Sequence, residues 1–193
     1  MKSENNTLYI RNMVCNRCIK VVREELEKLG LEIQSMILGE VVLKNNPDEN
    51  ELKKIDSALR KEGFELLEDK RQKTIEKIKN VIIEYIQHDM MKTDKKINIS
   101  DLLQKHIDRD YNTLSMLFSS VEGITIEHYF ILQKIEKAKE LLKYDELSLA
   151  EVAYKLGYSS VPHLSSQFKK TTGLTVSQFK KTSSNMRTAL DKL

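Results

Sequence analysis

Apolar and polar residues follow two different rhythms over the first 67 positions. Leu8 and Ile10 alternate with polar neighbours, which is typical of a strand with one buried face. Two later segments place apolar residues at steps of three and four, which predicts helices. These positions are Ile19, Val22, Leu26 and Leu29 in the first segment and Leu52, Ile55 and Leu59 in the second. With strand-like stretches at 33–38, 41–43 and 64–67, the predicted order is βαββαβ, that of a ferredoxin-like sandwich.

Beyond residue 74 the apolar spacing predicts helices only. The apolar face of the first of these helices consists of Ile75, Ile78, Ile82 and Tyr85. A long helix is predicted from about 126 to 142, with Phe130, Ile135, Ala138 and Leu142 inward. The predicted fold class is therefore α+β. A ferredoxin-like βαββαβ domain (1–68) and a charged junction (69–74) precede an all-α domain (75–184) and a C-terminal tail (185–193).

The all-α half contains an internal repeat. Residues 147–179, shifted back by 50, align with residues 97–129 without a gap. The identical pairs are Lys105 and Lys155, Leu114 and Leu164, Ser115 and Ser165, Phe118 and Phe168, Gly123 and Gly173, and Thr125 and Thr175. Each copy predicts a short helix, a turn of about four residues, and a second helix that ends at glycine. This is the plan of a helix-turn-helix unit, so the all-α half is expected to hold two of them.

Leu164 and Phe168 lie four residues apart and must face the core, which turns their polar neighbours outward. Small and polar side chains on such a helix can reach base edges or phosphates. The predicted DNA contacts are Ser160, Val161, His163, Ser165, Ser166, Lys169 and Lys170 in the later copy and Asn112, Thr113, Ser115 and Ser119 in the earlier one. An ordinary solvated helical face is the alternative.

Charge supports a nucleic-acid partner for the C-terminal quarter. The chain has a net charge of +3, but residues 147–193 alone carry 7 basic against 2 acidic residues. Such a basic excess is expected where a protein meets a phosphate backbone, although a solvated basic tail gives the same count. No apolar run is long enough to span a membrane and the first residues resemble no signal peptide, so we expect a cytoplasmic protein without a membrane partner. No catalytic constellation stands out, and an enzyme is not expected.

Cys15 and Cys18 are the two cysteines of the chain, in the sequence Met13-Val14-Cys15-Asn16-Arg17-Cys18. Two thiolates three apart at a helix start can converge on one soft ion, such as Cu(I) or Zn²⁺. The helix dipole and Arg17 are expected to lower the pKa of both thiols. We expect no required cofactor. The alternative is that Met13 and Cys18 belong to the core of an interaction module without an ion.

Two resemblances follow from these motifs. Residues 75–181 resemble the DNA-binding domain of AraC/XylS-type regulators, through the sequences LSLAEVAYKLGYSSVPHLSSQFKKTTGLTVSQFK and, for the linker helix, IEKAKELL. The resemblance implies seven helices with recognition helices at about 112–121 and 161–171, which enter successive major grooves on one DNA face. Residues 7–67 are similar to the heavy-metal-associated domain, whose MxCxxC loop holds Cu(I) or a similar ion; here Asn12 replaces that domain's usual glycine.

The departures from the AraC/XylS pattern predict unequal units. Ser166 and Met116 stand where arginine is usual, and the pair Lys169-Lys170 is Ser119-Ser120 in the first unit. In that unit's turn Ile107 replaces glycine, beside Asp108 and Asp110. We therefore expect the second unit to supply most of the affinity for DNA.

The function predicted from the sequence is a sequence-specific DNA-binding transcriptional regulator that responds to a soft metal ion through Cys15 and Cys18. Its partners would be double-stranded DNA and RNA polymerase, while the oligomeric state stays open. Two alternatives also stay open. One is a chaperone-like metal-handling protein whose helical half binds a partner protein, and the other is a regulator that senses redox state through the same thiols.

Overall fold

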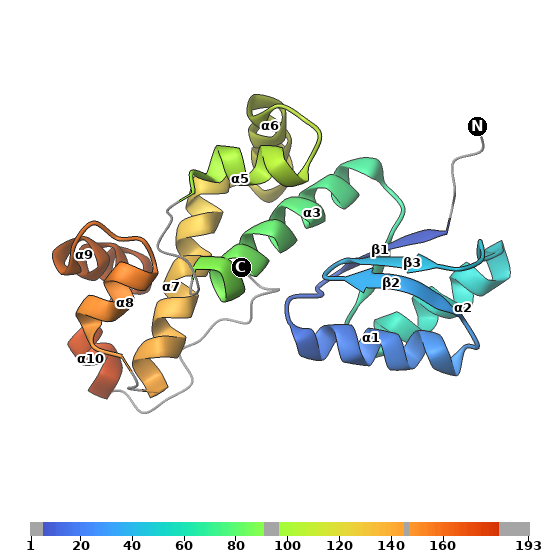
Figure 1. Cartoon of the computed structure of the whole chain (residues 1–193), viewed down its shortest axis with the longest axis horizontal. Helices are drawn as coiled ribbons and strands as arrows, with labels where there is room; N and C mark the ends of the chain where they lie inside the picture. The colour runs from blue at the N-terminus through green and yellow to red at the C-terminus, as the bar shows by residue number, and fades with distance from the viewer. Residues whose placement is uncertain (1–5, 91–96, 145–146, 182–193) are drawn as a thin grey trace. The chain divides into compact units, whose positions relative to one another are not determined.

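The structure, a computed structural model, describes residues 6–90, 97–144 and 147–181 (Figure 1). The chain divides into two compact units, Met1–Asn80 and Val81–Leu193. The first unit contains a small antiparallel sheet and the second is helical. Helix α3 (Lys70–Glu84) begins in the first unit and ends in the second, so a single helix contributes residues to both.

The first unit follows the predicted order βαββαβ. Its elements are β1 (Thr7–Arg11), α1 (Asn16–Lys28), β2 (Ile33–Ile37), β3 (Glu40–Leu43), α2 (Glu49–Lys61) and β4 (Glu65–Leu67). The strands lie in the order β2-β3-β1-β4, and all three neighbouring pairs are antiparallel. In the register of the sheet, Leu8 lies opposite Val41 and Ile10 opposite Leu66.

The core of this unit is the apolar face that the sequence spacing predicts. Leu8 and Ile10 are buried on β1, Val22 and Leu26 on α1, and Ile55 and Leu59 on α2. Ile19 and Leu52 are half-buried, and Leu29, which was expected on the inner face of the first helix, is 39% exposed. It lies at the C-cap of α1, where the chain leaves the helix before Gly30 adopts a positive φ of 76°.

Residues 70–74 are helical, although the sequence suggests a junction at 69–74. Asp69 lies directly before α3. Its side chain accepts hydrogen bonds from the backbone N–H groups of Arg71 and Gln72, which satisfies two donors at the start of the helix. Further along α3, the Asn80 side chain donates to the backbone oxygen of Leu38 at 3.2 Å. These contacts explain why the division between the units falls after Asn80 and not at the charged stretch.

The helical unit is built around one long helix. After α3 come a π-helical turn (Tyr85–Asp89), α5 (Ile99–His106), α6 (Tyr111–Glu122), α7 (Ile126–Tyr144), α8 (Leu149–Lys155), α9 (Val161–Thr172) and α10 (Val176–Lys181). Helix α7 contacts α6, α8, α9 and the π-helical turn, and in Figure 1 it runs between the α5–α6 pair and the α8–α10 group. Three of its four predicted inward residues, Ile135, Ala138 and Leu142, are buried, and Phe130 is half-buried.

The 50-residue repeat of the sequence is also a repeat of the structure. Helices α6 and α9 begin and end at positions that differ by 50, and each ends at a glycine with positive φ, 72° at Gly123 and 77° at Gly173. Their rings repeat as well. Phe118 packs on Tyr129 with centroids 5.5 Å apart, and Phe168 packs on Phe179 at 5.4 Å. The two copies therefore share one packing scheme around equivalent aromatic pairs.

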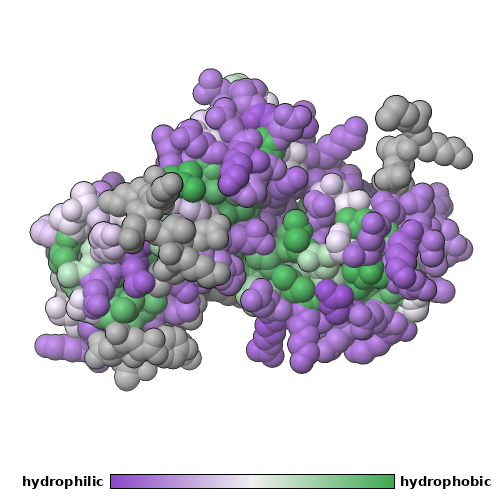
Figure 2. All heavy atoms as spheres, viewed as in Figure 1, coloured by the Kyte–Doolittle hydropathy of each residue, from purple (hydrophilic) through white to green (hydrophobic). Residues whose placement is uncertain are grey.

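Hydrophilic side chains cover most of the face displayed in Figure 2. Among the described helices, none combines the length and the apolar composition that crossing a bilayer requires.

We expect Phe118→Ala and Phe168→Ala each to lower the free energy of unfolding by ~3–5 kcal/mol, because each removes a ring that is fully buried. Urea denaturation followed by circular dichroism measures the loss. The control is Met116→Ala on the exposed side of α6, which should change stability by no more than ~0.5 kcal/mol. Equal effects of the three substitutions would show that the rings do not carry the core.

Candidate nucleic-acid interface and cysteine loop

Helices α6 and α9 present equivalent faces to solvent. Over their first eight residues, 111–118 and 161–168, the order of buried, half-buried and exposed positions is the same in both helices. Leu114 and Leu164 are fully buried, as are Phe118 and Phe168 one turn later. The burial of these pairs fixes the rotation of each helix and leaves the intervening residues on the outer face.

The outer face of α9 carries polar and basic side chains. Ser160 caps the helix, because its Oγ accepts a hydrogen bond from the backbone N–H of His163 at 3.2 Å. The His163 ring is held by Ser159, whose Oγ lies 3.0 Å from Nδ1, and by an edge-on contact with Tyr158 at 5.2 Å between centroids. Lys169 and Lys170 are exposed in the last turn. An anion that approaches α9 would therefore contact a capped helix start without a charged side chain and two exposed ammonium groups in the last turn.

The outer face of α6 has a different charge. Its cap is Asp110, whose carboxylate accepts hydrogen bonds from both the backbone N–H and the hydroxyl of Thr113. These hydrogen bonds hold the pKa of Asp110 below its ordinary value, so the group is a carboxylate at neutral pH. Helix α6 itself contains no Lys or Arg. The two units therefore share a shape and differ in electrostatic character.

The predicted contact residues fall into two groups. Seven are exposed: Asn112, Thr113, Ser160, His163, Ser166, Lys169 and Lys170. The other four are half-buried: Ser115, Ser119, Val161 and Ser165. Within this set the hydroxyl of Thr113 is already engaged by Asp110 and that of Ser160 by the backbone of His163.

Met116 is an outward residue of α6 that our set of predicted contacts omits. Its side chain is 75% exposed, and it is the residue equivalent to Ser166 in the repeat. The internal repeat indicated this residue, because the 50-residue shift aligns Met116 with Ser166, which is a predicted contact.

The turns before the two outward helices differ, and the sequence pointed to the difference. In the second unit Gly157 adopts a positive φ of 68° directly after the C-cap of α8. In the first unit the equivalent Ile107 is extended, with φ −128° and ψ 117°, and its side chain is buried. A buried branched side chain thus replaces a left-handed glycine at the corner of the first unit.

The two thiols lie together in the sheet unit. Cys15 is the N-cap residue of α1 and Cys18 lies in its first turn, with the two Sγ atoms 3.4 Å apart. Cys15 is exposed, Cys18 is half-buried, and Met13 is fully buried. Met13 is therefore a core residue, and the candidate site consists of the two thiols. Within residues 6–90, 97–144 and 147–181, no three His, Cys, Asp or Glu side chains gather as metal ligands.

The expected lowering of both thiol pKa values is wrong for Cys18. Burial raises the pKa of its thiol above the ordinary value, and the neighbouring Cys15 raises it further. Backbone hydrogen bonds from the loop act in the opposite direction but are weaker than the effect of burial. At neutral pH Cys18 is held as a thiol, so an ion that binds there must displace its proton.

Asn12 holds the entrance of the cysteine loop in place. Its φ is +71°, a conformation that favours glycine and that asparagine tolerates. This explains how asparagine can stand where the heavy-metal-associated pattern has glycine. The Asn12 side chain donates to the backbone oxygen of Gly63 at 3.0 Å, and its backbone N–H donates to Glu76 Oε1 on α3 at 3.1 Å.

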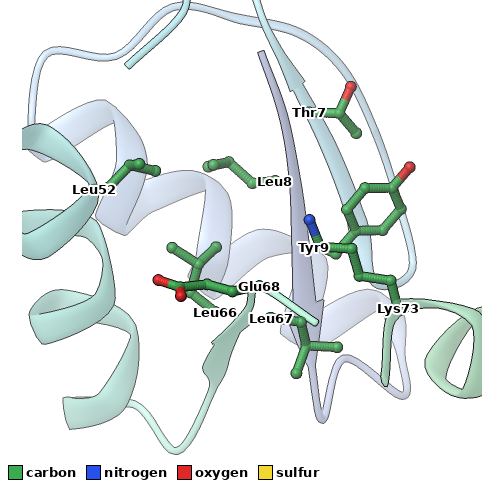
Figure 3. A pocket seen from close by; sticks show the side chains of 8 residues that line it. All are labelled: Thr7, Leu8, Tyr9, Leu52, Leu66, Leu67, Glu68 and Lys73. Atoms are coloured by element: carbon green, nitrogen blue, oxygen red, sulfur yellow. The ribbon is translucent and has the colours of Figure 1, made fainter. Parts of the chain in front are cut away.

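A separate pocket of about 260 Å³ lies beside strands β1 and β4. Eight residues line it: Thr7, Leu8, Tyr9, Leu52, Leu66, Leu67, Glu68 and Lys73. In Figure 3 the Lys73 side chain lies beside the ring of Tyr9, with Leu52 on the opposite side, and Lys73 Nζ is 5.0 Å from the ring centroid. The pocket shares no residue with the cysteine loop.

Comparison with known proteins assigns the helical region. Residues 104–182 match a family model described as a helix-turn-helix domain. The chain is 32% identical over 102 residues to the F1 operon positive regulatory protein of Yersinia pestis, a match that covers 52% of this chain and 33% of that protein. It is 28% identical over 96 residues to the xylose operon regulatory protein of Haemophilus influenzae, covering 50% and 24% respectively. The chain thus spans a third or less of these curated relatives.

Among solved structures, the C-terminal domain of the two-component response regulator yesN from Fusobacterium nucleatum is 30% identical. The match has a TM-score of 0.42 and covers 51% of this chain and 96% of that domain. The helix-turn-helix match agrees with helices α6 and α9 of the helical unit, each of which has an N-terminal side-chain cap and ends at a glycine. Over residues 104–182 the chain is therefore similar to helix-turn-helix domains.

Proposed function

We propose that this chain is a sequence-specific transcriptional regulator of the AraC/XylS type that places α6 and α9 in the major groove of duplex DNA. The observation that carries the proposal is the repetition of one outward face on two helices, with the same buried Leu–Phe pair and the same glycine end. A pair of equivalent, similarly exposed helices suits two stretches of a regular duplex. Such a regulator acts in the cytoplasm and directs RNA polymerase.

The second unit supplies most of the affinity in this proposal. Helix α9 has an uncharged cap and two exposed lysines, whereas α6 has a carboxylate cap and no basic residue. Phosphate contacts by lysines release counterions and contribute affinity without reading sequence. The first unit then contributes mainly through shape and through the few side chains that reach outward.

We further propose that the cysteine loop of this regulator is a binding site for a soft metal ion. The residues present suit such an ion, because two sulfur atoms only 3.4 Å apart can both reach a metal at bond lengths of ~2.3 Å. Cys15 and Cys18 would hold Cu(I) or Zn²⁺, and soft thiolates are ligands that these ions accept. The same pair also suits reversible oxidation to a disulfide, in which case the loop would sense redox state.

A route from the loop to the DNA-binding half supports the regulatory role. Asn12, at the entrance of the loop, donates its backbone N–H to Glu76, which is buried on α3. Helix α3 continues without interruption to Glu84, past the division between the units. A shift of the loop on ion binding would therefore act on a helix that belongs to both halves.

The proposed function predicts binding to duplex DNA that weakens steeply with salt. In the full chain, Lys169→Ala with Lys170→Ala should lower the slope of log affinity against log salt by about 2, because each phosphate contact contributes ~0.9 to that slope. Fluorescence anisotropy with DNA selected from a random pool measures it. Binding that does not depend on salt, or binding to a protein and not to duplex DNA, would favour the metal-handling alternative.

The two caps provide a matched test of the electrostatic difference between the units. Asp110→Ser should strengthen DNA binding severalfold, because it removes a negative charge from a helix start that the proposal places near phosphates. Serine keeps the helix cap, so stability should hardly change. The reciprocal Ser160→Asp should weaken binding by at least as much. If both variants bind DNA like the wild type, the caps do not face phosphates.

The cysteine loop is tested by metal uptake under reducing conditions. We expect about one equivalent of Cu(I) or Zn²⁺ per chain, and Cys15→Ser with Cys18→Ser should abolish uptake. Because the pKa of Cys18 is raised, its proton must leave when the ion binds, and the apparent affinity should fall as pH is lowered.

If the ion is a regulatory signal, DNA affinity must differ between the loaded and the empty protein, and DNA must change ion affinity by the same factor. Glu76→Gln should reduce this coupling and leave ion uptake intact, since it weakens the contact to Asn12 without touching a thiol. Uptake with unchanged DNA binding would leave a metal site that is not a switch. Failure to take up any ion would contradict the metal site.

A further inference from the structure

Met116 is the most exposed of the large apolar side chains on the described part of the chain, at 75%. It lies in the middle of α6, one turn after Asn112, on the face that the burial of Leu114 and Phe118 turns outward. Its equivalent in the second unit is Ser166, which is also exposed. A long apolar side chain thus occupies, in the first unit, a position that is small and polar in the second.

Several polar side chains around Met116 are already engaged or partly covered, whereas Asn112, one turn earlier, is exposed. The hydroxyl of Thr113 donates to Asp110, and the hydroxyl of Ser120 donates to the backbone oxygen of Leu117 at 2.7 Å. Ser115 and Ser119 are half-buried. Met116 is therefore a highly exposed side chain of this face that has no polar group to satisfy.

We propose that Met116 reads a thymine by packing against its 5-methyl group in the major groove. This inference rests on the proposed binding of DNA by α6. The thymine methyl is the apolar group on the major-groove edges of the bases, and apolar side chains recognise it by contact. Methionine suits the role because it is unbranched and flexible and so adapts to a shallow apolar surface. The first unit then reads sequence by an apolar contact, where the second uses polar and basic groups.

The test replaces single thymines by deoxyuridine, which removes only the methyl group. A duplex selected from a random pool by the full chain is synthesised with one thymine replaced at a time, and each affinity is measured at one salt concentration. The wild type should lose about fourfold at a particular thymine, the fold-change that corresponds to ~0.8 kcal/mol for one buried methyl group. Met116→Ala should bind the unmodified duplex more weakly and should bind thymine and deoxyuridine equally at that position.

Two variants serve as controls. Met116→Leu keeps an apolar side chain and should keep the preference for thymine, and Ser166→Ala, at the equivalent position of the second unit, should leave that preference unchanged. If Met116→Ala binds like the wild type, or remains sensitive to the same deoxyuridine, the inference is wrong; this is also the result expected if Met116 contacts a protein. If the full chain selects no duplex at all, the proposed function fails and the inference fails with it.

Discussion

The packing of one aromatic ring against another in each unit fixes which side of the outward helix faces solvent. Phe118 on Tyr129 and Phe168 on Phe179 hold α6 and α9 at centroid distances of 5.5 and 5.4 Å. Each ring, together with the buried leucine one turn earlier, fixes the rotation of its helix about the helix axis. Which residues of each helix lie on its outer face follows from this packing.

Much of the helical fold could be predicted because its constraints are local and periodic. A buried leucine and phenylalanine four residues apart, closed by a glycine, specify a helix, its inner face and its end in a dozen residues. The sequence indicated an unusual turn in the first helix-turn-helix copy but not its backbone conformation, and the division between the sheet unit and the helical unit was harder to predict. Ile107 replaces the turn glycine with a buried side chain, and α3 is held by the sheet through Asn80 and Leu38, contacts between residues far apart in sequence. Local patterns do not contain such contacts.

The candidate sites were predictable in position and less so in chemistry. Periodicity placed the outward residues of α9, and the spacing of Cys15 and Cys18 brought their sulfur atoms together. The hydrogen bond that engages Thr113 depends on the rotamer of its cap, and the raised pKa of Cys18 depends on how deeply the thiol is covered. In the second case burial outweighs the helix start that led us to expect a lowered pKa. Burial depth is a property of the folded chain, and the sequence alone gives no measure of it.

The two helix-turn-helix units can diverge in function because the residues that hold the fold differ from those that meet the partner. Serine and aspartate cap a helix almost equally well. The presence of Asp110 before α6 and of Ser160 before α9 therefore changes the charge at the helix start with little effect on folding. The same holds for Met116 and Ser166, whose side chains lie outside the core. Substitutions at these positions can thus change the outer faces of the helices with little effect on stability. The two copies of this scaffold therefore present different charge and polarity on equivalent outer faces.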